Sequence, residues 1–197
     1  MGLKDAVVIY APHDYSVFRD SSKAWGEREI DILIVGGLVK RRENKIVLDR
    51  ELEYANRLSK TGLNVVGIFL AKNKEERDLA DKAIFPHYLN IPLSLIASFM
   101  GNSKILFHPS PLESCSLVIY EGLNAGMHPV VREAGACREQ MDNVGFIYQD
   151  FRDAERRIGE ILSMDYYNPS IFTLQGEKFD RKNTIGLIKE ELKRFES

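Results

Sequence analysis

Continuous apolar runs recur along the chain, separated by longer stretches in which apolar residues return every three or four positions. The runs are rich in Val, Ile, Leu and Phe and do not alternate with polar residues, a pattern typical of parallel strands buried on both faces. They are Ala6–Tyr10, Asp31–Gly36, Leu63–Leu70, Lys104–His108, Pro129–Val131 and Gly145–Tyr148. The pattern therefore predicts a parallel sheet.

The stretches between these runs have the spacing of amphipathic helices. They are Glu43–Lys60, Lys74–Lys82, Leu93–Met100, Ser114–Asn124 and Phe151–Leu162, and three of them end at a glycine, as helices often do. Alternating strands and helices predict an α/β fold, a doubly wound Rossmann-like parallel sheet with helices on both faces. In such a sheet the ligand lies at the carboxyl ends of the strands.

The two ends of the chain differ from this alternating body. We expect one domain over residues 1–197, with residues 1–30 as a linker-like start and residues 164–197 as a C-terminal helical extension. The segment Glu177–Glu196 has the pattern of one amphipathic helix. Its apolar side chains fit docking onto the sheet, which we favour, or onto a partner.

Composition narrows the class of protein. The 197 residues are 44% hydrophobic and carry a net charge of −2, so the chain can bury a core but has no field that would attract nucleic acid. The cysteines, Cys115 and Cys137, fit free thiols in a reducing compartment, and we expect a cytoplasmic protein. No run approaches the roughly 20 apolar residues of a transmembrane helix, which leaves peripheral membrane association open.

One segment, Phe107–Val131, combines a buried strand, a polar loop, a helix and a second buried strand. Glu113 and Glu121 lie at and beyond the predicted helix start, where they could contact the two ends of an extended, hydroxyl-rich ligand. The free backbone amides at a helix start favour a phosphate. Taken without this context, the two glutamates are better explained as a charge near a helix N-terminus and a residue on a solvated helix face.

This segment resembles the donor-binding signature of the retaining glycosyltransferases of family 4 and their GT-B relatives. In that family Pro-Ser precedes Glu-x7-Glu, and Ala-x-Gly-x-Pro-Val-Val follows it. This chain has Pro109-Ser110 before Glu113 and Glu121, and then Ala125-Gly126-Met127-His128-Pro129-Val130-Val131. The resemblance implies that Glu113 binds hydroxyls of the transferred sugar, our catalytic assignment, and that Glu121 accepts both ribose hydroxyls. It also implies that the amides of Cys115, Ser116 and Leu117 bind the diphosphate. The family usually has an aromatic residue and then glycine where this chain has Cys115 and Ser116.

A second segment, Val35–Glu43, is a strand end with two glycines followed by three cations. Cations at a helix start oppose the macrodipole, so they need an anionic ligand or full solvation. The resemblance implies an arginine after the first glycine and a lysine five positions later, both on the donor diphosphate. Gly37 and Arg42 occupy these positions. We therefore assign donor binding to Gly36, Gly37, Lys40 and Arg42, with Lys40 or Arg41 replacing the missing charge.

Two weaker matches extend the resemblance over residues 6–163. Arg132–Glu139 resembles a Gly-Gly-x-x-Glu turn, in which we interpret Glu139 as a structural residue, and Pro12–Phe18 resembles the segment that joins the two GT-B halves. The acceptor-binding half that precedes this segment in the family has no counterpart here. We therefore expect an acceptor-domain subunit as a partner, or a chain that is part of a longer enzyme.

The resemblance implies a glycosyltransferase that transfers a sugar with retention from a UDP-sugar or GDP-sugar. No Asp-x-Asp follows a strand, so we expect neither a metal nor another cofactor. The first alternative is a nucleotide- or nucleotide-sugar-binding module without transferase activity, which Gly37 and Ser116 favour. The second is an unrelated flavodoxin-like or epimerase-like domain, although no Gly-x-Gly-x-x-Gly follows the first strand.

Overall fold

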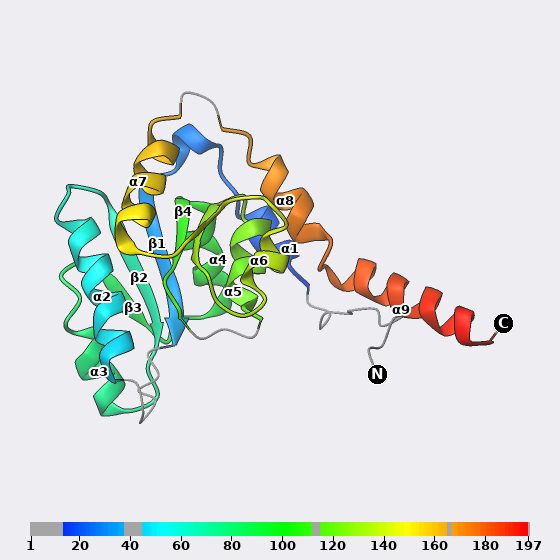
Figure 1. The fold of residues 1–197 in the computed structure, drawn as a ribbon, viewed down its shortest axis with the longest axis horizontal. Helices are drawn as coiled ribbons and strands as arrows, with labels where there is room; N and C mark the ends of the chain where they lie inside the picture. The colour runs from blue at the N-terminus through cyan, green and yellow to red at the C-terminus, as the bar shows by residue number, and fades with distance from the viewer. Residues whose placement is uncertain (1–13, 38–44, 112–114, 165–166, 197) are drawn as a thin grey trace.

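The protein is built around one six-stranded parallel sheet, as a computed structural model shows for residues 14–37, 45–111, 115–164 and 167–196 (Figure 1). The strand order is β3-β2-β1-β4-β5-β6. The strands are β1 (Ile30–Gly37), β2 (Val65–Leu70), β3 (His87–Leu89), β4 (Ser103–His108), β5 (His128–Arg132) and β6 (Phe146–Tyr148). This order confirms the doubly wound α/β prediction. The predicted strand Ala6–Tyr10 lies outside the described residues.

Helices cover both faces of the sheet. One face carries α2 (Lys45–Ser59), α3 (Lys74–Ala80) and α7 (Phe151–Leu162) over one buried apolar cluster. The other carries α1 (Ser16–Asp20), α4 (Leu93–Gly101), α5 (Leu117–Asn124), α6 (Cys137–Met141) and α8 (Ser170–Glu177) over a second cluster. Each of the five helices predicted by spacing is present, because its apolar stripe faces one of these clusters.

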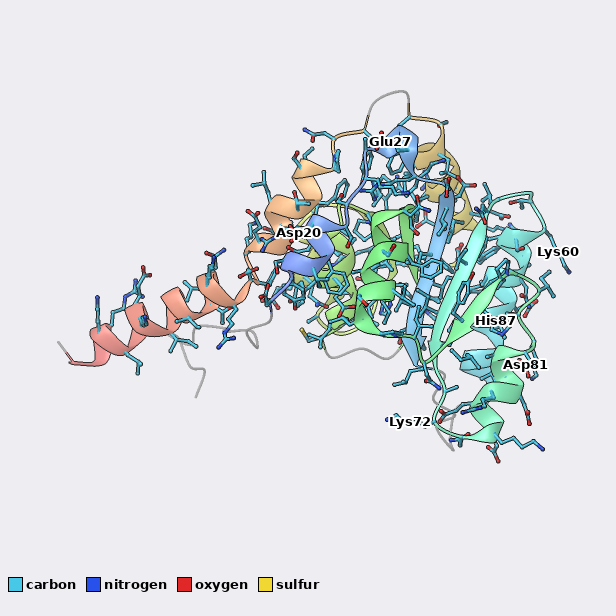
Figure 2. The ribbon with its side chains drawn as sticks, turned by 180° about the vertical axis from the view of Figure 1, so that it is seen from behind. Asp20, Glu27, Lys60, Lys72, Asp81 and His87 are labelled. Atoms are coloured by element: carbon cyan, nitrogen blue, oxygen red, sulfur yellow. The ribbon has the colours of Figure 1, made fainter. Side chains whose placement is uncertain are left out.

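The sequence did not predict the edge strand β3 or the short helices α1, α6 and α8. β3 has only three residues, and its exposed Tyr88 gives no continuous apolar run. At this edge Nε2 of His87 lies 3.7 Å from Oδ1 of Asp81, which follows α3 (Figure 2). Strands and helices this short carry too few apolar positions for periodicity to detect.

The described part of the expected linker-like start, residues 14–30, packs on the domain. Phe18 of α1 is buried in the core, and α1 lies so close to α4 that a Cβ on Gly101 would come within 1.8 Å of the Ser21 carbonyl oxygen. A 3₁₀ turn, Trp25–Glu27, then leads to the buried Arg28 and β1. These contacts hold the segment against the same face as α5.

The C-terminal region consists of two helices instead of one. α8 crosses α5 closely, since a Cβ on Gly176 would lie 2.5 Å from Nδ2 of Asn124. α9 (Arg181–Glu196) begins after Asp180, whose carboxylate accepts the Lys182 amide at 3.1 Å and pairs with Arg19 at 2.8 Å. α9 packs on the domain at its start, through the buried Thr184, and then extends away from the body (Figure 1).

Candidate functional site

The candidate site lies where the central strands β1 and β4 separate. Their last register pair among the described residues is Leu33 with Leu106, although β1 continues to Gly37 and β4 to His108. The helix after β1 covers one face and the helix after β4 the other. This is the switch point of a doubly wound sheet, where such folds bind ligands.

On the β1 side of the site the strand ends in two glycines, and Gly36 has open space beside it. Gly36 pairs with Phe69 of β2, and a Cβ added to Gly36 would meet no atom within 4 Å. Packing therefore does not require glycine at this position, whereas close approach of a ligand to the backbone would favour it. Gly37 ends the strand. Lys40 and Arg42, the predicted cations, lie outside the described residues.

The β4 side is the start of α5, which the sequence placed at Ser114 and the structure places at Leu117. Ser116 is the N-cap residue with φ −90° and ψ 115°, and its hydroxyl makes no capping bond to the helix. Its amide donates to Oε1 of Gln140 at 3.1 Å. The Ser116 amide, which the sequence assigned to the diphosphate, is thus already bonded to a buried side chain, and its role in donor binding stays a prediction.

Two other backbone donors lie at the start of α5. The Ile119 amide bonds back to the Ser116 carbonyl at 3.3 Å. The amides of Leu117 and Val118, as the first two of the helix, have no intrahelical acceptor. Leu117 was predicted to bind the donor, and Val118 was not. Cys115 is exposed next to this position, with Sγ 3.7 Å from the Tyr120 hydroxyl.

Glu121 lies one turn further along α5. Burial raises the pKa of its carboxyl to about 7. No described residue donates a hydrogen bond to this carboxylate, and no described cation pairs with it. A half-buried carboxylate that lacks such a donor can accept hydrogen bonds from a ligand, and vicinal hydroxyls are suitable donors. Glu121 and Leu117 thus lie on the helix that follows β4, and the glycines lie at the end of β1, the neighbouring central strand.

Tyr15 is a residue near Glu121 that the sequence did not indicate. Its ring lies 6.3 Å from that of Tyr120, the neighbour of Glu121 in α5. Burial, and then the charge of Glu121, raise the pKa of the Tyr15 phenol. A tyrosine in a segment that resembles an interdomain linker gives no signal of this position, because only the packing of α1 on α5 creates it.

Two histidines that were not assigned to the site are buried, and one further predicted site residue lies outside the described residues. Glu113, the catalytic assignment, is outside them. His108 and His128 are buried, and burial lowers the pKa of His128 to about 4, so its ring is neutral near pH 7. Among the described residues, no three His, Cys, Asp or Glu side chains are grouped to hold a metal ion. No helix in the described part of the chain is long and apolar enough to cross a membrane.

Comparison with known proteins identifies the architecture. No protein-family model matches the sequence, and a search of curated proteins finds no match. Solved structures do match. The glycosyltransferase AviGT4 of avilamycin A biosynthesis superposes with a TM-score of 0.65 at 13% identity, over 98% of this chain and 59% of that chain. The fold is one half of the GT-B architecture.

Two further matches agree with this result. Anabaena Alr3699/HepE in complex with UDP gives a TM-score of 0.68 at 14% identity, over 95% of this chain and 57% of its own. The N-terminal domain of Candida albicans trehalose-6-phosphate phosphatase gives 0.68 at 9% identity, over 94% and 49%. The present chain therefore spans about half of each of these three structures. At these identities the likeness establishes the fold, and function has to be argued from the site.

Proposed function

We propose that this chain is the donor-binding half of a retaining glycosyltransferase that uses a nucleoside diphosphate sugar. The observation that carries the proposal is the half-buried Glu121, which lies one turn along a helix that starts at the split end of the sheet. A site for a nucleoside diphosphate needs donors for the phosphates and an acceptor for the ribose hydroxyls. The start of a helix can supply the donors, and a carboxylate can supply the acceptor. HepE, which has the same fold, was crystallised with UDP and with UDP-glucose, which supports UDP-sugars over GDP-sugars.

In this proposal each predicted residue acts on one part of the donor. Glu121 accepts the ribose hydroxyls, and the amides at the start of α5 together with Lys40 and Arg42 bind the diphosphate. Gly36 and Gly37 let the donor approach the end of β1, and Glu113 orients the transferred sugar. The positive groups stabilise the charge that develops on the departing nucleoside diphosphate, which lowers the barrier to transfer. We expect no metal in this step, so EDTA should leave binding unchanged.

Transfer also needs an acceptor site, which we assign to a domain outside this sequence. α9 offers an apolar contact for it, because Leu187 and Leu192 are 43% and 57% exposed on a helix that extends away from the body. Either a separate subunit or another part of a longer chain fits this role. Free thiols and a nucleotide-sugar substrate are consistent with the cytoplasm.

The second candidate function is nucleotide or nucleotide-sugar binding without transfer. One observation favours it: the Ser116 amide, which a family-4-like site would offer to the diphosphate, is held by Gln140. In addition, position 37 holds glycine where the family pattern has an arginine that contacts the diphosphate. Release of free sugar or glycosylated product from a bound UDP-sugar, once an acceptor domain is supplied, distinguishes the transferase from the binding module.

The experiment that tests donor binding is thermal unfolding with saturating UDP, GDP and ADP and their sugar conjugates. At about 100 times the dissociation constant a ligand stabilises the folded state by about 2.7 kcal/mol, or roughly 5–10 °C in Tm for a domain of this size. We expect a base-selective shift that Glu121→Ala reduces to less than half. Absence of a shift with every nucleotide would overturn the proposal for the isolated chain.

A further inference from the structure

The most completely bonded polar side chain near the site is Gln140, which lies in α6 and is 0% exposed. Its Oε1 accepts the Ser116 amide at 3.1 Å, and its Nε2 donates to the Ser116 carbonyl at 2.9 Å. One side-chain amide thus satisfies both backbone groups of a single residue. That residue is the N-cap of α5.

A second buried glutamine, in α8, holds Gln140 in place. Nε2 of Gln175 donates to the backbone carbonyl of Gln140 at 3.1 Å, and both glutamines are buried. A second link between α8 and α6 is the 2.9 Å ion pair of Lys178 with Asp142. The start of α5 is therefore fixed through α6 to α8, three segments that are distant in sequence.

The bonds to Gln140 replace the usual capping of this helix. An N-cap serine normally accepts an amide of the first turn with its hydroxyl, which consumes one of the free donors. Ser116 makes no such bond. The backbone of Ser116 is instead held from outside the helix. The first-turn amides of Leu117 and Val118 therefore keep a fixed direction and receive no bond from the Ser116 hydroxyl.

We propose that Gln140 is a positioning residue that fixes the start of α5 for the diphosphate of the donor. The inference rests on the proposed function and adds a residue that does not touch the ligand. A polar residue at a fully buried position costs free energy unless all its groups are bonded, and here they are bonded to the one turn that would face the phosphates. Fixed donors bind an anion more tightly than mobile ones, since less ordering is needed on binding.

The test compares Gln140→Met with Gln175→Met, a matched change of one buried glutamine to an apolar side chain of similar length. Calorimetry measures the affinity of each variant for UDP and for uridine, which shares the ribose and base but lacks phosphate. We expect Gln140→Met to weaken UDP binding about 5–20-fold and uridine binding less than twofold. Gln175→Met leaves both bonds between Gln140 and Ser116 in place and removes only the support from α8, so the ratio of the two affinities should change less than in Gln140→Met. Equal weakening of both ligands, or of neither, in Gln140→Met would overturn the inference.

Amide hydrogen exchange gives a readout that is independent of nucleotide binding. In the original chain the Ser116 amide should be protected, and in Gln140→Met its exchange should accelerate at least tenfold while the core strands stay protected. Unchanged exchange of Ser116 would also overturn the inference. If the original chain binds no nucleotide, the proposed function fails and this exchange measurement alone decides the role of Gln140. Gln140→Asn, too short to make both bonds, replaces Gln140→Met if that variant does not fold.

Discussion

The guanidinium of Arg28 donates a 2.9 Å hydrogen bond to the carbonyl oxygen of Ala125, the residue that ends α5. The same buried side chain donates to the carbonyls of Ser103 and Lys23 and to the Ser22 hydroxyl. A cation at a helix C-terminus is also favoured by the macrodipole. Arg28 therefore joins the segment before the sheet, the start of β4 and the end of the site helix.

Arg28→Met should destabilise the fold, because it leaves several buried carbonyl oxygens without their donor. We expect a loss of about 3–5 kcal/mol in the free energy of unfolding, measured by urea denaturation. Arg152→Met, at an exposed position of α7, is the matched control and should change stability by less than about 0.5 kcal/mol. Equal effects of the two substitutions would contradict the assigned role of Arg28.

Glu121→Ala should weaken nucleoside diphosphate binding by about 1.5–3 kcal/mol, since two charge-assisted hydrogen bonds to the ribose are lost. Isothermal calorimetry with UDP measures the change, and circular dichroism checks that the fold survives. Glu155→Ala on α7, on the opposite face of the sheet, serves as control and should bind UDP normally. Unchanged affinity of Glu121→Ala would remove this carboxylate from the site.

Nucleotide binding should strengthen as pH rises through 7. Burial raises the pKa of Glu121 to about 7, so the ionised acceptor is the minor form at pH 6 and the major form at pH 8. If the ribose hydroxyls bind the ionised form, affinity should increase about tenfold between these pH values. Uridine is the ligand of choice, because it has no phosphate that titrates in this range. A flat pH profile, or the same slope in Glu121→Gln, would count against the idea.

The same carboxyl should make the free protein less stable at high pH. Its pKa is raised from an ordinary value of 4.5 to about 7, so the folded state keeps a proton that the unfolded chain has lost. This contribution to stability is fully present below pH 4.5 and is lost as pH rises through 7, to a total of about 3 kcal/mol. The free energy of unfolding of Glu121→Gln, relative to that of the original protein, should therefore increase by up to this amount between pH 4 and pH 8. Urea denaturation at both pH values measures it.

Two helical glycines should respond in opposite directions to alanine. A Cβ on Gly101 would come within 1.8 Å of the Ser21 carbonyl oxygen, so Gly101→Ala has to push α1 from α4. We expect a loss of about 1–3 kcal/mol in the free energy of unfolding. Gly159 in α7 has nothing within 4 Å of an added Cβ, and Gly159→Ala should stabilise by about 0.5–1 kcal/mol. Thermal unfolding of the two variants decides the matter, and a stabilised Gly101→Ala would refute the close contact.

Much of the sheet could be predicted from the sequence, because a strand buried on both faces is apolar throughout. Asp31–Gly36 and Lys104–His108 needed no tertiary information, and together with the helix after each they locate the switch point. β3 could not be predicted in this way, since its position at the edge leaves Tyr88 exposed. The split of the C-terminal region after Asp180 depends on a capping carboxylate and an ion pair with Arg19, which periodicity does not contain.

The candidate site was predictable to a smaller extent. Glu121 and the start of α5 follow from a local motif, whose residues are close in sequence. The bonds of Gln140 to Ser116 cross 24 positions, and no local signal marks a glutamine as buried and fully bonded. The motif alone therefore suggests a free amide at Ser116, and only the tertiary structure shows that this amide is already bonded.

The separation of β1 and β4 also has a mechanical consequence. Backbone pairing joins the two halves of the sheet, β3-β2-β1 and β4-β5-β6, along the amino-terminal part of β1. Among the described residues, the last pair between β1 and β4 is Leu33 with Leu106. Beyond this pair, the carboxyl ends of β1 and β4 run to Gly37 and His108 without a register pair between them. A molecule that contacts both the glycines at the end of β1 and the start of α5 would link the two halves of the sheet. Occupancy should then raise the force needed to pull the halves apart, and should slow unfolding in strands that the molecule never touches.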